Sequence, residues 1–501
     1  MKEVQLVIPM AGDSKLFNDA GYVGPKWLIE IDGKSMIQHV VDQFSGVTDV
    51  LFICREEDSQ HQPYLESLGG KVVKVNQSTG PVDTILQSSE HIADDKEVVV
   101  SYCDHGMAWG FSSFVDEARQ GNYEGAMTCY RKFHPHLLAS KNLYTYCLTK
   151  DNNLLEVQDK QAHTEEREGQ FISSDVFYFK SGSLLKEYFN KSLNNLSMNG
   201  FVSPVYNLLV EDGLSVHIHE IERMLLWATP EDLKNYKDWS NYFNRDRSNR
   251  AGEQDFTVLI PMCGKGSRFA KEGYQLPKPL LPIDNLPMFA GVVNCLPKHQ
   301  DNVFVCSEEH NAEVIIKSYY PQAKIKSINY VTEGFAESCE VGIGLMNEED
   351  PLLISPCDNG VSYDEESFLR MIADDSNDVI FWVVKGSQAP QVNPSMYTWT
   401  YVDEDGCVED MVYKEKPETD LATTPISIGI MYFRKARYLL EGLRLNRERG
   451  MRPTGELCMD SVAHQLTRSG YKVKVFEAEH YACWGTPGDY ETYNHWRKHF
   501  K

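Results

Sequence analysis

The sequence predicts an α/β protein with two tandem domains, each a mixed, mostly parallel sheet flanked by helices. Apolar, β-branched runs alternate with segments of helical spacing, which is typical of sheets built from crossover units. At 501 residues the chain is too long for one hydrophobic core. The same order of elements and motifs occurs twice, because the string beginning at Ile260 repeats the one beginning at Ile8, 252 residues earlier.

The first copy starts with a strand that runs directly into a loop. Its expected strands are the apolar runs 4–9, 50–54, 71–75 and 97–102. Helical spacing is found at 36–44 and, after Thr79-Gly80, at 81–92. The strand at 97–102 ends at Cys103-Asp104.

The second copy repeats this order. Its expected strands are 256–260, 303–306, 325–331 and 352–355, with a helix at 336–345. The later halves also correspond, since 426–433 matches 173–179 and the string at 484–489 matches 227–232. The polar stretch 244–254 lacks apolar periodicity and indicates a linker. We therefore expect domains at 1–243 and 255–501.

Composition excludes several classes of function. The net charge of −24 disfavours a nucleic-acid partner, which requires basic surface. No apolar run is long enough to predict a membrane span, and the N-terminus enters a strand without room for a signal peptide. The 12 cysteines form no CxxC pair, which favours reduced thiols and a cytoplasmic protein.

A glycine-rich loop follows the apolar run 256–260. Gly264 and Gly266 allow the backbone to approach a ligand closely, and Arg268 offers a planar fork suited to phosphate oxygens. Ten residues after Arg268, Lys278 lies between two prolines, which limits the entropy lost on placing it. The loop therefore predicts a site for a polyanion such as a nucleoside triphosphate.

Two aspartates are candidate metal ligands. Asp358 follows a predicted central strand at the edge where parallel sheets place their ligand sites. Asp489 follows Trp-Gly-Thr-Pro-Gly near the end of the domain. Carboxylates in this setting suit Mg²⁺, which prefers one or two of them together with phosphate oxygens and water.

These motifs resemble those of the sugar-1-phosphate nucleotidyltransferases, also called NDP-sugar pyrophosphorylases. The resemblance covers nearly all of 255–501 in the expected order: the loop, Pro-Lys-Pro-Leu, the strand-end aspartate, Glu-Lys-Pro, Gly429, Gly455-Glu456 and Gly-Thr-Pro-x-Asp. It implies Rossmann-like, GT-A-like domains that transfer a nucleoside monophosphate from an NTP (CTP, UTP or dTTP) to a phosphorylated acceptor.

The resemblance also implies residue roles. Arg268 and Lys278 would act on the phosphates, and Asp358 and Asp489 would hold Mg²⁺. The expected nucleotide-binding residues are Pro261, Met262, Cys263, Gly264, Gly266, Ser267, Glu333 and Gly334. The expected acceptor-binding residues are Glu415, Lys416, Gly429 and Glu456.

The first copy departs from this pattern. The replacements are Ser14 for Gly266, Leu16 for Arg268, Trp27 for Pro279, Asp175 for Gly429 and, approximately, Ser203 for Glu456. It keeps Lys26, Asp104 and Asp232, which form a second candidate site. Losing an arginine and gaining a carboxylate both oppose triphosphate binding. We expect a degenerate domain that binds another ligand or mimics the partner of a homo-oligomer.

Other functions stay open. One alternative is a CTP-dependent cytidylyltransferase for phosphocholine or phosphonates, with Trp382, Tyr397 and Trp399 framing a cationic head group. Core packing is the commoner role for such aromatics. A glycosyltransferase would usually carry Asp-x-Asp at the strand end, where this chain has Cys357-Asp358-Asn359.

Overall fold

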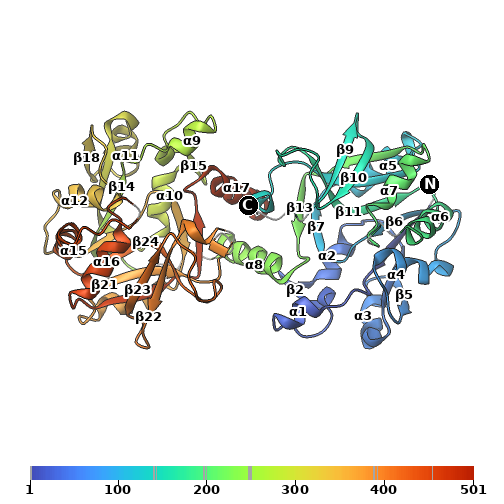
Figure 1. Ribbon diagram of the computed structural model, residues 1–501, viewed down its shortest axis with the longest axis horizontal. Coiled ribbons are helices and arrows are strands. Elements are labelled where there is room, and N and C mark those ends of the chain that lie inside the picture. Colours follow the sequence, from blue (N-terminus) through green and yellow to red (C-terminus); the bar gives the residue numbers. More distant parts are fainter. Residues whose placement is uncertain are drawn as a thin grey trace. The chain divides into compact units, whose positions relative to one another are not determined.

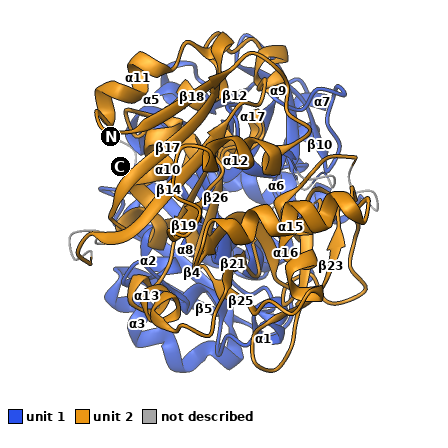
Figure 2. Ribbon diagram, turned by 90° about the vertical axis from the view of Figure 1, so that its left-hand side faces the viewer, with its two compact units in different colours: residues 1–237 blue, residues 238–501 orange. Residues whose placement is uncertain are grey.

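A computed structural model describes residues 3–138, 142, 144–195, 198, 200–245, 251–387, 390–391, 393–453 and 455–501. It divides into two compact units, unit 1 (residues 1–237) and unit 2 (residues 238–501), coloured separately in Figure 2. The division falls within helix α8 (Pro230–Asn244). Residues 246–250 of the expected linker lie outside the described residues.

Unit 1 is built on a nine-stranded sheet of order β5-β4-β1-β6-β11-β8-β12-β10-β9. Five of these strands, β5, β6, β9, β10 and β11, are labelled in Figure 1. Its strands are β1 (Val4–Pro9), β4 (Asp49–Arg55), β5 (Gly70–Val75), β6 (Glu97–Ser101), β8 (Gly125–Tyr130), β9 (Thr145–Lys150), β10 (Asn153–Asp159), β11 (Phe171–Phe179) and β12 (Val216–Glu220). Parallel pairing joins β5, β4, β1 and β6, and β11 then runs antiparallel between β6 and β8. The sheet is therefore mixed, as predicted.

Helices cover both faces of this sheet, which explains why its central strands are apolar throughout. They are α1 (Lys15–Asp19), α2 (Met36–Asp42), α3 (Gln62–Ser67), α4 (Pro81–Gln87), α5 (Phe111–Gln120), α6 (Gly182–Leu193) and α7 (Val205–Glu211). One core joins α4, α6 and α7 to one side of the strands, and a second core joins α2, α3 and α5 to the other.

Unit 2 repeats the arrangement with the order β18-β17-β14-β19-β24-β21-β25 and with β22 and β23 attached through β24. Its strands are β14 (Gln254–Met262), β17 (His299–Ser307), β18 (Lys324–Ile328), β19 (Leu352–Ile354), β21 (Val379–Val384), β22 (Thr398–Val402), β23 (Val408–Tyr413), β24 (Ile426–Phe433) and β25 (Val473–Glu477). Its helices are α9 (Ser267–Lys271), α10 (Met288–Cys295), α11 (Glu313–Tyr319), α12 (Phe335–Ile343), α13 (Glu365–Ala373), α15 (Arg437–Glu448), α16 (Met459–Arg468) and α17 (Pro487–Phe500).

A short two-stranded ribbon lies beside the end of the central strands in each unit. In unit 1 it pairs β7 (His105–Ala108) with β13 (Arg223–Leu226). In unit 2 it pairs β20 (Asn359–Ser362) with β26 (His480–Cys483). Because each ribbon starts directly after a strand-end aspartate, it brings the last motif of the unit to that aspartate.

The predicted strands and helices occur in the predicted order, with bounds shifted by a few residues. The predicted helix 81–92 is shorter, because α4 ends at Gln87 and a 3₁₀ turn over Ser89–His91 follows. Within the described residues no helix is long and apolar enough to cross a bilayer.

Candidate active site

The end of strand β14 opens into a cavity of about 320 Å³ in unit 2. Its walls are the glycine-rich loop, the segment before α12 and the residues that follow β19. It is lined by Pro261, Met262, Cys263, Gly264, Lys265, Lys278, Pro279, Val331, Thr332, Glu333, Gly334, Phe335, Ser338, Pro356, Cys357, Asp358 and Glu456. Motifs separated by up to 195 residues therefore meet at one edge of the sheet.

A partly buried ion pair lines this cavity. Lys278 Nζ lies 2.6 Å from Asp358 Oδ2, and both side chains are less than one quarter exposed. Burial by itself would lower the pKa of Lys278, but the Asp358 carboxylate outweighs that effect and raises the pKa above its ordinary value. Lys278 is therefore a fixed cation at neutral pH.

The loop passes from the cavity into helix α9 through Gly266. This residue caps the helix in the left-handed region, with φ of 61°, and a Cβ there would lie 3.1 Å from Lys278 Cβ. Both features favour glycine. Ser267 and Arg268 follow on the first turn of α9, where Arg268 is exposed. The three residues lie beside the lining of the cavity rather than in it.

The β20–β26 ribbon brings Asp489 to the same region. Trp484 N donates to Asp358 O at 2.8 Å, and Cys483 Sγ lies 3.4 Å from Asp489 Oδ2. Burial, then Asp489 and Asp358, raises the pKa of the Cys483 thiol well above its usual range. Thr486 caps α17: its hydroxyl accepts a hydrogen bond from Asp489 N–H at 3.2 Å and donates to Asp489 Oδ2 at 2.7 Å.

Gly429 lies in a bulge of β24 beside the cavity. Its φ is 74°, and a Cβ there would lie 2.8 Å from Pro356 Cγ. Glu415 and Lys416 are exposed on the segment after β23, outside the cavity lining. Of the predicted acceptor residues, Glu456 lines the cavity.

Lys265, Thr332 and Ser338 are lining residues that the sequence reasoning missed. Thr332 and Ser338 lie 2.8 Å apart through their hydroxyls, and neither has a chemical signature in the sequence. Lys265 could have been found from the sequence, because it is a cation between the two loop glycines and the first copy has Asp13 in its place.

Unit 1 has a corresponding cavity of about 360 Å³. Lys26 Nζ lies 2.6 Å from Asp104 Oδ2, which repeats the Lys278–Asp358 pair. The loop differs at Ser14, which occupies the Gly266 position and has a φ of −97°. Its hydroxyl accepts a hydrogen bond from the backbone N–H of Lys26 at 2.9 Å. Leu16, at the Arg268 position, is 63% exposed.

The third retained aspartate of unit 1 already has a partner. His136 Nε2 lies 3.0 Å from Asp232 Oδ1, and both side chains are about nine-tenths buried. The histidine comes from a 3₁₀ turn over Pro135–Leu138. Asp232 is therefore less available to a cation than Asp489.

Asp175 keeps the backbone of Gly429 but adds a carboxyl group. It lies in the equivalent bulge of β11, with a φ of 66°. Its backbone carbonyl accepts a hydrogen bond from the N–H of Tyr102 at 3.2 Å. Desolvation, followed by the charges of Asp104 and Asp159, raises the pKa of Asp175 to about 7.

The aromatic cage considered for a cationic head group is not assembled, because two of its three members lie in the core, while Tyr397 is only partly buried. Trp382 packs against Tyr363, Phe368 and Phe476 in the core and is fully buried. Trp399 is also fully buried and donates Nε1–H to Pro394 O.

Comparison with known proteins gives a family for each unit. Residues 6–163 match the model of the MobA-like NTP transferase domain, and residues 258–485 match that of the nucleotidyl transferase family. A search of curated proteins finds no match.

Solved structures similar to this chain include two that each span about half of it. One is a nucleoside-diphosphate-sugar pyrophosphorylase from Vibrio cholerae RC9, with 18% identity, a TM-score of 0.39, and coverage of 46% of this chain and 98% of that one. The other is an inositol-1-phosphate CTP transferase from T. maritima, with 15% identity, a TM-score of 0.39, and coverage of 49% and 97%. With likeness this low, the two family models carry the assignment. The chain therefore carries two nucleotidyltransferase-class domains in tandem, one matching each family model.

Proposed function

We propose that unit 2 is the catalytic unit and transfers a nucleoside monophosphate from an NTP to a phosphorylated acceptor, with a sugar 1-phosphate as the favoured acceptor. The charge of the loop and its helix carries this proposal. Residues 264–271 hold Lys265, Arg268 and Lys271 with no acid, whereas 12–19 hold Asp13, Lys15 and Asp19. Only the loop of unit 2 is strongly cationic, as a polyphosphate requires.

The proposed reaction is a single displacement. A phosphate oxygen of the acceptor attacks the α-phosphorus of the NTP, the bond to the β-phosphate oxygen breaks, and pyrophosphate leaves with that electron pair. The attacking oxygen is already anionic, so no general base is required. Lys278 would neutralise charge on the α-phosphate, and Arg268 would contact the departing phosphates. Such transfer depends chiefly on positioning and on charge neutralisation.

Asp358 and Asp489 fit a Mg²⁺ site. Asp489 Oδ2 lies 3.4 Å from Cys483 Sγ, and the charge of Asp358 also acts on that thiol. Asp358 Oδ2 pairs with Lys278, and a Cβ on Gly485 would lie 3.2 Å from this oxygen, so glycine leaves the space beside the ion pair open. The protonated Cys483 thiol is no competing ligand for a hard cation. When bound, Mg²⁺ would neutralise phosphate charge and orient the triphosphate.

The acceptor would enter from the side of Gly429 and Glu456, with Lys416 and Glu415 moving toward it from the exposed segment after β23. A sugar phosphate is favoured over phosphocholine because Trp382 and Trp399 lie in the core and cannot face a quaternary ammonium.

Unit 1 would serve as a modified partner domain. Asp13, Asp175 and the His136–Asp232 pair all oppose a triphosphate with its cation. We propose that unit 1 binds a different ligand or none, and that turnover belongs to unit 2.

The test is pyrophosphate release by the full chain, screened with CTP, UTP, dTTP, ATP and GTP against sugar 1-phosphates, phosphocholine and a phosphonate. We expect release with one sugar phosphate and one preferred base. Release with phosphocholine alone would favour the cytidylyltransferase alternative. No release in any pairing, with hydrolysis of a nucleotide sugar, would favour the glycosyltransferase.

A further inference from the structure

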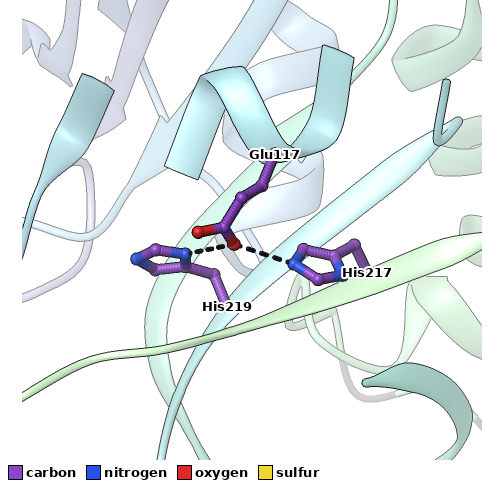
Figure 3. A group of neighbouring side chains, drawn as sticks. All are labelled: Glu117, His217 and His219. Atoms are coloured by element: carbon purple, nitrogen blue, oxygen red, sulfur yellow. Dashed lines mark hydrogen bonds and ion pairs between the residues drawn. The ribbon is translucent and has the colours of Figure 1, made fainter. Parts of the chain in front are cut away.

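A side-chain cluster on unit 1 lies apart from both cavities. Glu117 projects from α5, and His217 and His219 come from the neighbouring strand β12, as Figure 3 shows. Residues two apart on a strand share one face of a sheet, so the two imidazoles lie side by side. Val216 and Ile218 point to the other face, into the core. The fold therefore fixes both rings beneath one carboxylate.

The cluster has the geometry of a small chelate. One oxygen, Glu117 Oε2, lies 2.9 Å from His217 Nε2 and 2.8 Å from His219 Nδ1. The three potential ligand atoms all lie within 4.8 Å of one another. Ligands of tetrahedral zinc, at bond lengths of about 2.0–2.2 Å, lie roughly 3.3–3.6 Å apart. An outward movement of the carboxylate by less than about 1 Å would bring its oxygen to that spacing from each nitrogen, and small rotations of the rings would set the spacing between the two nitrogens.

Aromatic neighbours hold the two rings in place. Tyr123 stacks on His217 with centroids 4.9 Å apart, and Phe114 meets His219 edge-on at 5.5 Å. Both histidine side chains are about nine-tenths buried, whereas that of Glu117 is 45% exposed. The nitrogens are thus preordered, and the carboxylate side leaves room for an entering ion and a water ligand.

We infer that Glu117, His217 and His219 form a binding site for a divalent transition metal, Zn²⁺ in the first instance, with water as the remaining ligand. Two imidazoles and one carboxylate suit zinc, whereas Mg²⁺ prefers oxygen ligands and would not use this set. The inference is independent of the proposed reaction, because the ligands belong to unit 1 and to neither cavity.

The affinity is limited by one ring. When His217 Nε2 binds metal, the ring proton must occupy Nδ1, which is buried and has no hydrogen-bond partner among the described residues. Metal-bound histidines usually donate that proton to an acceptor, and loss of such a bond costs about 10–100-fold in affinity. We therefore expect binding weaker than at structural zinc sites by about this factor.

The test is a Co²⁺ titration of the metal-stripped full chain, followed by Zn²⁺ displacement. We expect one equivalent with visible d–d bands and no thiolate-to-cobalt charge-transfer band, and no displacement by excess Mg²⁺. The variants Glu117→Gln and His219→Gln should each lower affinity about tenfold or more, and the double variant His217→Gln/His219→Gln should lose that equivalent. His299→Gln, which changes a histidine of unit 2, is the matched control and should bind as the wild type does.

Stability keeps this test interpretable. Zn²⁺ should raise the Tm of the wild type and of His299→Gln, but not that of the double variant, whose unliganded Tm shows whether it has folded. A charge-transfer band would assign the metal to cysteines and overturn the inference. An unchanged affinity in the folded double variant would overturn it as well.

Discussion

Asp175 makes the stability of unit 1 depend on pH. Its carboxyl has a pKa of about 7 in the folded chain, against an ordinary value of 3.8. Between these two values the unfolded chain has released a proton that the folded chain retains. Stability therefore falls as pH rises through this window and levels off above pH 7. Asp175→Asn removes the titrating group, so the variant should gain stability over the wild type as pH rises.

The size of the effect follows from the same pKa values. Each pH unit within the window corresponds to about 1.4 kcal/mol, so moving from pH 5 to pH 8 gives the variant at most about 2.7 kcal/mol. Because water can still reach a carboxyl group beside a cavity, the actual gain in stability is expected to lie between about half of this limit and the full limit. For a unit of this size, about 1.4–2.7 kcal/mol corresponds to roughly 3–11 °C in Tm.

The assay is the difference in Tm between Asp175→Asn and the wild type at pH 5, 6, 7 and 8. Asparagine tolerates the left-handed backbone, so the comparison isolates the charge. Asp175→Gly should be more stable than Asp175→Asn by about 1 kcal/mol at every pH, because glycine adopts the positive φ without a steric cost. A difference in Tm that stays constant from pH 5 to pH 8 would refute the argument that a desolvated Asp175 carboxyl titrates near neutrality.

Paired substitutions test which unit turns over. In the pyrophosphate assay, Lys278→Ala and Asp358→Asn should each lower kcat by about 10²–10³-fold. The matched unit 1 variants, Lys26→Ala and Asp104→Asn, should change kcat by less than about threefold. The opposite ranking would move catalysis to unit 1. Lys265→Asp should raise the KM for NTP by about tenfold or more, since it reverses a charge at the cavity, and an unchanged KM would place the triphosphate elsewhere. Gly429→Asp should abolish activity and lower stability by about 2–4 kcal/mol, measured by urea denaturation, because its Cβ would meet Pro356 at a positive φ; a stable, active variant would contradict the bulge geometry.

Much of the fold could be predicted because its signals are local. Strands β1, β4 and β24 are apolar, β-branched runs, and their periodicity is visible without any partner. The internal repeat added the pairing of motifs, since Lys278–Asp358 and Lys26–Asp104 occupy matching places. The short strands of the ribbons were missed because four residues carry too little pattern.

Part of the site could not be predicted because it depends on contacts between distant segments. Nothing near Asp232 in the sequence indicates that His136 engages it, and nothing near Glu117 indicates two histidines a hundred residues away. The pKa of Asp175 likewise depends first on its burial in the folded unit and then on the charges of Asp104 and Asp159.

The sequence by itself determined that this chain is a duplicated α/β protein, that each copy carries a lysine and a strand-end aspartate, and that only the second has a cationic loop. These properties follow from residue type and spacing, which folding does not alter. Only the tertiary structure decided which charges meet. The β20–β26 ribbon brings Asp489 near Asp358. In unit 1, a 3₁₀ turn places His136 against Asp232, the aspartate that matches Asp489. Electrostatic energies depend on distance and desolvation, and both exist only once the chain has folded.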